Sequence, residues 1–363
     1  MSNIVISGYY GFNNAGDEAL LTAILQALEA VDPETGITVI SGNPGDTKLR
    51  HHVDAIYRFH AGHILRALSQ ADLLISGGGS LLQDVTSKKS LLYYLTIIAL
   101  AKLKGCKVML YAQGIGPIRN SFMRFLTKIV CRHANAITVR DEDSAAELVR
   151  LGLSPEKVQV TADCVLTLEP TDRVAGRLIL EEAGLDLNKP ILGLSVRTWP
   201  DNLHCLQQLA DAAAALSKKY DAQVAILPLQ YSMDYETCEL LRNYMPRTEQ
   251  PVVLLHRHFS TEEFLSIIGN FQLLIAMRLH ALIFAAIMGV PLLAVSYDPK
   301  VDAFVKAVGA RAAGTVETLA AADVVTAAEA VWGQDVTAQS EKIAAMRTLA
   351  SQNAEIAFSL LPH

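Results

Sequence analysis

Residues 272–295, QLLIAMRLHALIFAAIMGVPLLAV, predict a buried strand, a buried helix and a second buried strand joined by short turns. Gly289 and Pro291 divide this apolar run, so it does not form one continuous membrane-spanning helix. A strand, a helix and a strand in this order are typical of parallel sheets. Arg278 and His280 interrupt the apolar pattern where the first strand ends, which raises the question of what they face.

Short apolar runs alternate with longer helical patterns through the rest of the chain, and this alternation predicts an α/β protein with mostly parallel sheets. Residues 166–177, LTLEPTDRVAGR, lose the periodicity and predict a linker. We therefore expect two Rossmann-like domains that face each other across a cleft. The N-terminal domain comprises residues 1–170, and the C-terminal domain comprises residues 171–363 with terminal helices.

The composition indicates sizeable apolar cores and no general attraction for nucleic acid. The chain has 363 residues, of which 51% are hydrophobic, and its formal net charge is −6. The five cysteines are scattered and odd in number, which favours reduced thiols in a cytosolic protein. The first residues, MSNIVISGYYG, lack the basic and apolar regions of a signal peptide. We expect a cytoplasmic protein that at most contacts a membrane surface.

A first glycine-rich segment, GYYGFNNAGDEALLTA at residues 8–23, joins a predicted strand to a predicted helix. Glycines at such a junction let backbone N–H groups approach an anion beside the N-terminus of the helix. The spacing matches neither the dinucleotide-binding nor the mononucleotide-binding motif. Asn14 and Asp17 stand at the helix start and are candidate ligand contacts, although a simpler interpretation makes Asp17 the N-cap of the helix.

A second glycine-rich segment, SGGGSLLQD at residues 76–84, also follows a predicted strand. Gly78, Gly79 and Ser80 suit close approach of a ligand to the backbone, but a tight turn would explain them equally well. Arg140 stands at the end of another predicted strand, AITV. It either binds a ligand or forms a salt bridge with Asp141 nearby.

Charged residues also follow the ends of predicted strands in the second half. Arg278 follows QLLIAM, His280 lies in the first turn of the next helix, and Lys300 follows VPLLAVSYD. Ligands bind outside the carboxyl ends of parallel strands, so we expect these residues to share a site. A histidine in an apolar context is, however, usually an ordinary core residue. Weaker candidates at strand ends of this half are Arg197, Gln230 and Asp234.

Two helix starts and one basic helix complete the pattern. Ser144, with Glu147 three residues later, predicts a capping box, and Ser260 precedes a predicted helix that begins at Thr261. In residues 119–133, RNSFMRFLTKIVCRH, basic side chains recur every four residues. Such a stripe either contacts anionic lipid headgroups or a diphosphate, or belongs to an ordinary surface helix.

The ordered set of motifs GYYGFNNAGDEAL, ISGGGSLLQD, AQGIGP, TVRDEDS and AMRLHALIFA resembles the polysaccharide pyruvyltransferase family, from about residue 3 to residue 310. The resemblance implies a GT-B-like fold and transfer of pyruvate from phosphoenolpyruvate to two sugar hydroxyls, with release of phosphate. The likeness to the bacterial cell-surface branch further implies a role in cell-wall biogenesis and surface-layer anchoring. The implied acceptor is a lipid-diphosphate-linked disaccharide whose N-acetylmannosamine is pyruvylated at O4 and O6.

The resemblance also implies roles for individual residues. Arg278 and Leu279 match phosphoenolpyruvate-binding positions and His280 a catalytic one, while the remaining matches line the donor site. A histidine suits proton delivery to the methylene carbon, and Asp17 or another polar group would activate the acceptor hydroxyl. The scheme needs phosphoenolpyruvate as co-substrate but no cofactor or metal. The predicted catalytic residues are His280 and Asp17, and the predicted substrate-binding residues are Arg140, Arg278, Leu279, Lys300, Asn14, Gly78, Gly79 and Ser80.

Two other classes of protein share parts of this pattern. A GT-B glycosyltransferase or a sugar-nucleotide epimerase would have the same architecture, but no acidic residue suited to bind a ribose follows the helix that begins near Arg278. A carbohydrate-binding protein without catalytic activity would not require the cations at successive strand ends.

Overall fold

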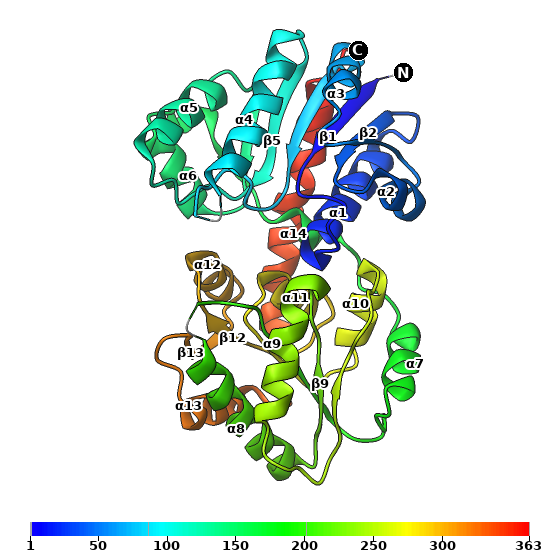
Figure 1. Ribbon diagram of the computed structural model, residues 1–363, viewed down its shortest axis with the longest axis vertical. Coiled ribbons are helices and arrows are strands. Elements are labelled where there is room, and N and C mark those ends of the chain that lie inside the picture. The colour runs from blue at the N-terminus through cyan, green and yellow to red at the C-terminus, as the bar shows by residue number, and fades with distance from the viewer. Residues whose placement is uncertain (1, 86, 201, 363) are drawn as a thin grey trace. The chain divides into compact units, whose positions relative to one another are not determined.

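A computed structural model of the chain describes residues 2–85, 87–200 and 202–362 (Figure 1). These residues form two compact units. Unit 1 comprises the chain up to Phe12, Asp17–Leu168 and the chain from Ala345 onward, and unit 2 comprises Asn13–Gly16 and Glu169–Ala344. The change at Leu168 lies beside the predicted boundary. The last helix, however, is shared between the two units, whereas the sequence analysis assigned it to the second domain alone.

Unit 1 contains a seven-stranded parallel sheet with the strand order β3-β2-β1-β4-β5-β6-β7. Its strands are β1 (Asn3–Ser7), β2 (Gly36–Ser41), β3 (Asp54–Tyr57), β4 (Leu73–Gly77), β5 (Lys107–Gln113), β6 (Ala136–Val139) and β7 (Gln159–Val160). The helices that follow these strands are α1 (Ala15–Val31), α2 (Pro44–His51), α3 (Ala61–Gln70), α4 (Lys88–Leu103), α5 (Ser121–Cys131) and α6 (Glu142–Arg150), with part of α14 (Thr337–Ser359).

The apolar runs of unit 1 form strands because both faces of the sheet are covered (Figure 1). Val5 and Leu74 pack in one core with Leu95 of α4. Successive side chains of a strand point to opposite faces, and Ile4 and Ile6 are accordingly buried on the other face. β1 and β4 are neighbours, so the two glycine-rich segments that follow them leave the sheet side by side. This is the point at which the strand order reverses, where doubly wound sheets bind ligands.

Unit 2 contains a six-stranded parallel sheet with the order β10-β9-β8-β11-β12-β13. Its strands are β8 (Ile191–Ser195), β9 (Gln223–Ile226), β10 (Val252–Leu254), β11 (Leu273–Ala276), β12 (Leu292–Ser296) and β13 (Arg311–Thr315). Its helices are α7 (Val174–Glu182), α8 (Leu203–Tyr220), α9 (Tyr231–Tyr244), α10 (Thr261–Ile268), α11 (Leu279–Ile287), α12 (Pro299–Val308) and α13 (Ala321–Val331). The predicted fold class, α/β with two Rossmann-like domains, is confirmed.

The two predicted helix starts have different outcomes. Ser260 caps α10, and its side chain and that of Glu263 form a complete capping box. The capping box predicted at Ser144 is wrong, because α6 begins at Glu142 and its N-cap is Asp141. The Ser144 hydroxyl instead accepts a hydrogen bond from the backbone N–H of Ile115 at 3.0 Å. No described helix combines the length and the apolar composition that a membrane crossing requires.

Candidate functional site

The start of α1 places Asn14 and Asp17 differently from the simpler interpretation of the sequence. Asn14 precedes the helix, and its side-chain oxygen accepts a hydrogen bond from the N–H of Gly16 at 3.1 Å. Asp17 is the third residue of α1 and half-buried, so the interpretation of Asp17 as the N-cap is wrong. The buried carboxylate of Glu18, which the sequence analysis missed, accepts a hydrogen bond from the N–H of Gly11 at 2.9 Å and fixes the loop.

The second glycine-rich segment is held by a buried side chain. Gln113 donates from Nε2 to the carbonyls of Gly78 at 3.3 Å and Gly79 at 2.8 Å. Both glycines have positive φ, 64° and 70°, which other residues rarely adopt. The N–H of Gly78 donates to the carbonyl of Tyr111, so it is engaged within the sheet. A Cβ on Gly79 would lie 3.3 Å from Oδ1 of Asp17, so the loop packs beside that carboxylate.

Arg140 is almost completely buried at the end of β6, with 6% of its side chain exposed. Its Nη2 donates to the hydroxyl of Ser80 at 3.0 Å, so the structure brings these two predicted residues together. Its Nε lies 3.2 Å from Asp141 and its Nη1 lies 3.4 Å from Asp163. The predicted salt bridge to Asp141 is therefore present. A Cβ on Gly114 would lie 2.8 Å from Nη2 of Arg140 and from the hydroxyl of Ser80, so a larger residue there would require these side chains to shift.

In unit 2, Arg278 stands directly before α11 and pairs with a fully buried carboxylate. Its Nε donates to Asp234 Oδ2 at 2.9 Å, and its Nη2 donates to Asp234 Oδ1. The backbone N–H of Gln230 also donates to Asp234, at 3.0 Å. Asp234 lies 44 residues before Arg278, so the sequence pattern could not pair them. This bidentate contact fixes the plane of the guanidinium and directs Nη1 away from the carboxylate.

His280 is the second residue of α11, and its ring lies against Gly16. A Cβ on Gly16 would lie 2.1 Å from Nδ1 of His280, so only glycine permits this contact. The short segment is held in place because Asn14 bridges to Gln230 and the N–H of Ala15 donates to Leu229 at 2.9 Å. Gly16 thus contacts His280 and also donates its N–H to Asn14, and the nearby imidazole explains why the motif has a glycine at this position.

A tyrosine that the sequence analysis missed lies among cations at the same edge. Tyr297 follows β12, and its hydroxyl accepts a hydrogen bond from Arg197 at 2.9 Å. Lys300 Nζ lies 5.6 Å from the centroid of its ring. Burial alone would raise the pKa of Tyr297, but the charges of Lys300, Arg197 and Arg278 outweigh it and lower that pKa. β8 and β12 both flank β11, which is why residues distant in sequence meet here.

The surroundings of Lys300 and Leu279 bear on their predicted roles in substrate binding. Lys300 forms an ion pair with Asp298 at 3.4 Å, so its charge is shared. Leu279 is 6% exposed and is one of the buried residues by which α11 packs into the core. Its predicted part in phosphoenolpyruvate binding stays a prediction.

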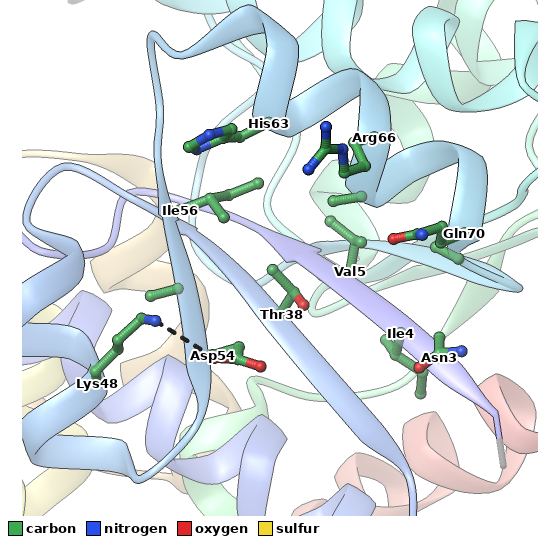
Figure 2. Close-up of a pocket in the computed structure, with 13 residues that line it drawn as sticks. Asn3, Ile4, Val5, Thr38, Lys48, Asp54, Ile56, His63, Arg66 and Gln70 are labelled. Atoms are coloured by element: carbon green, nitrogen blue, oxygen red, sulfur yellow. Dashed lines mark hydrogen bonds and ion pairs between the residues drawn. The ribbon is translucent and has the colours of Figure 1, made fainter.

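A pocket of about 710 Å³ lies elsewhere in unit 1, between α3 and the sheet, as Figure 2 shows. It is lined by Asn3, Thr38 and Asp54 near the amino ends of β1, β2 and β3, and by Arg66 of α3. Lys48 reaches Asp54 at its rim, at 3.3 Å. It contains none of the predicted site residues, and it lies at the edge of the sheet opposite the one where parallel sheets bind substrates. We therefore do not assign the reaction to it.

Comparison with protein families gives one match. The model of the family described as polysaccharide pyruvyl transferase matches residues 14–299, a range that includes Asp17, Arg140, Arg278 and His280. Lys300 lies one position beyond it. A search of curated protein sequences finds no match.

Solved structures resemble the whole chain at low sequence identity. A putative UDP-N-acetylglucosamine 2-epimerase from Listeria monocytogenes has a TM-score of 0.67 and 11% identity, covering 97% of this chain and 94% of that one. The Anabaena protein HepE, in complex with UDP and glucose, has a TM-score of 0.67 and 12% identity, covering 99% of both chains. The UDP-GlcNAc 2-epimerase from Neisseria meningitidis has a TM-score of 0.63 and 12% identity, also covering 99% of both chains. These likenesses establish a GT-B-like fold.

Proposed function

Because the chain belongs to the polysaccharide pyruvyl transferase family, we propose that it transfers pyruvate from phosphoenolpyruvate to two hydroxyl groups of one sugar, forming a cyclic ketal. The observation that carries the proposal is the arrangement at the carboxyl edge of the six-stranded sheet. There an oriented guanidinium, Arg278, directly precedes the helix whose second residue is His280. Arg278 could therefore bind a small anionic substrate close to His280, which would donate the proton.

Donor binding would use the cations at the strand ends. Phosphoenolpyruvate carries a carboxylate and a phosphate, which arginine recognises through paired N–H donors. The support for Arg278 is that Asp234 holds its guanidinium plane in place. Lys300 would add a flexible charge to the phosphate. Arg140, whose guanidinium donates to Ser80, remains a predicted phosphoenolpyruvate contact of unit 1.

The proposed chemistry has two steps that conserve atoms. A sugar hydroxyl oxygen adds to C2 of phosphoenolpyruvate while His280 delivers a proton to the methylene carbon, which becomes a methyl group. The C2–O bond to phosphate then breaks, and the second hydroxyl adds to the resulting oxocarbenium-like carbon. One hydroxyl proton restores His280 and the other leaves with the phosphate. Asp17 would accept one of these hydroxyl protons during the attack and pass it to the departing phosphate, and the proposed reaction uses no metal or cofactor.

For the acceptor we propose a lipid-diphosphate-linked disaccharide of the cell wall, pyruvylated at O4 and O6 of N-acetylmannosamine, with a role in surface-layer anchoring. We further propose that the enzyme acts at the cytoplasmic face of the membrane. The exposed rings of Phe122 and Phe125 on α5, beside Lys128, support such a peripheral contact. Arg124 of the same helix pairs with Glu147 at 2.8 Å, so it adds less to a basic surface than the sequence suggested.

The test is incubation of the protein with phosphoenolpyruvate and a synthetic disaccharide diphosphate lipid. We expect stoichiometric phosphate release and an acceptor heavier by pyruvic acid less one water. His280→Ala should abolish product while phosphoenolpyruvate binding stays measurable by calorimetry. The matched control is His204→Ala, an exposed histidine of α8 in the same unit, which should retain activity. Turnover by His280→Ala would refute the acid role, and no turnover by the unaltered protein would refute the function.

Calorimetric titration of the protein with each donor also separates the proposal from the glycosyltransferase or epimerase alternative. The epimerases and HepE share 11–12% identity with this chain, and at that level a likeness extends to the fold and not to the ligand. We expect binding of phosphoenolpyruvate and none of UDP-N-acetylglucosamine as a donor. Hydrolysis or epimerisation of the nucleotide sugar would favour the alternative.

A further inference from the structure

A third arginine, Arg58, is held by aromatic rings instead of carboxylates at the carboxyl edge of the seven-stranded sheet. Its guanidinium carbon lies 5.2 Å from the ring centroid of Phe12, 4.8 Å from that of Phe59 and 4.6 Å from that of Tyr93. Among the described residues no carboxylate pairs with Arg58, and its Nε is buried without a hydrogen-bond partner. We call these four residues the Arg58 cluster.

The cluster is fixed in position by contacts from three parts of unit 1. The Tyr93 hydroxyl on α4 donates to the carbonyl of Arg58 at 3.1 Å. The Phe12 ring stacks on Tyr9 with centroids 4.3 Å apart, and a Cβ on Gly42 would lie 2.6 Å from that ring. The rings therefore keep their arrangement without a ligand, which lowers the entropic cost of binding one.

The cluster nevertheless remains open to solvent. Phe59 is 67% exposed, and the neighbouring Tyr57, whose ring centroid lies 5.9 Å from that of Phe59, is 47% exposed. If the rings only stabilised the fold, we would expect them to be buried. Two exposed rings beside a fixed cation instead present a surface with an apolar part and a positive part.

Such a surface matches a sugar that carries phosphate. The C–H faces of a pyranose ring pack against aromatic rings, and a guanidinium binds phosphate oxygens through paired N–H donors. A nucleotide base would also stack on such rings, so the shared chemistry is a ring compound linked to diphosphate. The experiment below distinguishes these sources.

The cluster lies close to the predicted catalytic carboxylate of unit 1. Phe12 is five residues before Asp17, in the loop that follows β1. Glu18, which follows Asp17, accepts a hydrogen bond at 2.9 Å from the N–H of Gly11, which precedes Phe12. The loop that carries Phe12 is therefore tied to the start of α1, where Asp17 lies.

We propose that the Arg58 cluster is the subsite that binds the acceptor through the saccharide and diphosphate beyond the pyruvylated sugar. This inference rests on the proposed function and names the part of the acceptor that the cluster recognises. Phe59 and Tyr57 contact the saccharide, and Arg58 contacts the diphosphate. The reacting sugar then extends toward Asp17.

The test compares three acceptors: the disaccharide diphosphate lipid with a short chain, the same disaccharide as a neutral methyl glycoside, and a UDP-linked sugar. For Arg58→Met we expect KM of the diphosphate acceptor to rise about tenfold or more, because a charged hydrogen bond is lost. KM of the methyl glycoside and KM of phosphoenolpyruvate should not change. Phe59→Ala should raise KM for both the diphosphate acceptor and the glycoside.

Matched controls come from the same unit. Arg66→Met removes an exposed arginine of α3, and Leu103→Ala removes an apolar side chain that is 82% exposed at the end of α4. Neither substitution should change any KM. If Arg58→Met does not fold, Arg58→Lys and the solvent-exposed Phe59→Ala still carry the test. Weakened use of the UDP-linked sugar by Arg58→Met would support diphosphate recognition with a nucleotide as its source.

The outcomes separate the two proposals. If the unaltered protein uses none of the acceptors, the proposed function fails. If it uses them but Arg58→Met changes the KM values of charged and neutral acceptors equally, or not at all, the cluster is only structural and this inference is overturned.

Discussion

The arginines at the carboxyl edges of the two sheets differ in the groups that contact them. Around Arg140, one cation faces the two carboxylates of Asp141 and Asp163. At the edge of unit 2, and among the residues that the structure describes, Asp234 is the one carboxylate paired with Arg278, and Arg197 contacts a tyrosine hydroxyl instead of a carboxylate. Arg140 is therefore paired with two carboxylates and Arg278 with one. The number of carboxylates beside each arginine indicates how much positive charge is left to bind an anion, and by that measure the edge of unit 2 is better suited to an anion.

The largest expected effect comes from removing the carboxylate that holds Arg278. Asp234 is fully buried, so Asp234→Asn leaves a buried cation without a counter-charge and should lower the free energy of unfolding by about 3–5 kcal/mol. Asp141→Asn should lower it by only about 1 kcal/mol, because Asp163 and Ser80 still hold Arg140. Urea unfolding at neutral pH measures both. Equal losses would show that the two edges hold arginine in the same way.

The two glycines that make room for functional side chains sharpen the comparison through activity. Gly16→Ala places a Cβ 2.1 Å from Nδ1 of His280, so the imidazole must move, and kcat should fall roughly a hundredfold. Gly114→Ala crowds Arg140 less, at 2.8 Å from Nη2, and should mainly raise KM for phosphoenolpyruvate.

Thermal unfolding of Gly16→Ala is the control that separates a loss of kcat from a loss of folded protein. The new Cβ crowds the imidazole, which should cost about 1–3 kcal/mol of stability, partly offset by the preference of a helix for alanine over glycine, so the variant should remain folded in the assay. A variant that keeps full kcat would show that the position of His280 is not needed.

A smaller effect, which depends on pH, should distinguish Tyr297 from tyrosines of unit 1. The pKa of Tyr297 is lowered in the folded state by Lys300, Arg197 and Arg278, so its ionised form stabilises the fold. That stabilisation is fully present above the ordinary pKa of 10.0 and is lost as pH falls through the lowered value.

The stability difference between the unaltered protein and Tyr297→Phe should therefore grow as pH rises from neutral toward 10.0. Unfolding in urea at several pH values measures this difference. Tyr111→Phe in unit 1 should show the opposite trend, because burial raises the pKa of Tyr111 well above its usual range. If the stability difference between Tyr297→Phe and the unaltered protein did not depend on pH, Lys300, Arg197 and Arg278 would not lower the pKa of Tyr297.

The smallest expected effect is on thiol labelling, which reports each unit separately. All five cysteines are free and buried. Burial raises the pKa of Cys106 of unit 1 to about 11 and that of Cys205 of unit 2 to about 12. A disulfide reagent at neutral pH should leave the native protein almost unlabelled and modify every thiol in urea. Fast labelling of one thiol in the native state, located by mass spectrometry, would identify the unit that opens.

The sequence alone determined the fold class, because buried parallel strands must be continuous apolar runs and the helices between them must be amphipathic or buried. It also placed Arg278, His280 and Arg140 at strand ends, since a charged residue that ends an apolar run marks the edge of a sheet. It did not reveal β3 or β13, which are edge strands of four and five residues with several exposed positions. Such strands carry little apolar signal, because only one neighbour and part of one face cover them.

Only the tertiary structure decided which groups meet. Asp234 pairs with Arg278 across 44 residues, and Arg197 meets Tyr297 across 100. The crossover connections of parallel strands bring residues from distant parts of the chain to one edge, so spacing in the sequence does not indicate these contacts. For the same reason, the contact of Gly16 with His280 and the rings around Arg58 became visible only once the strands were paired.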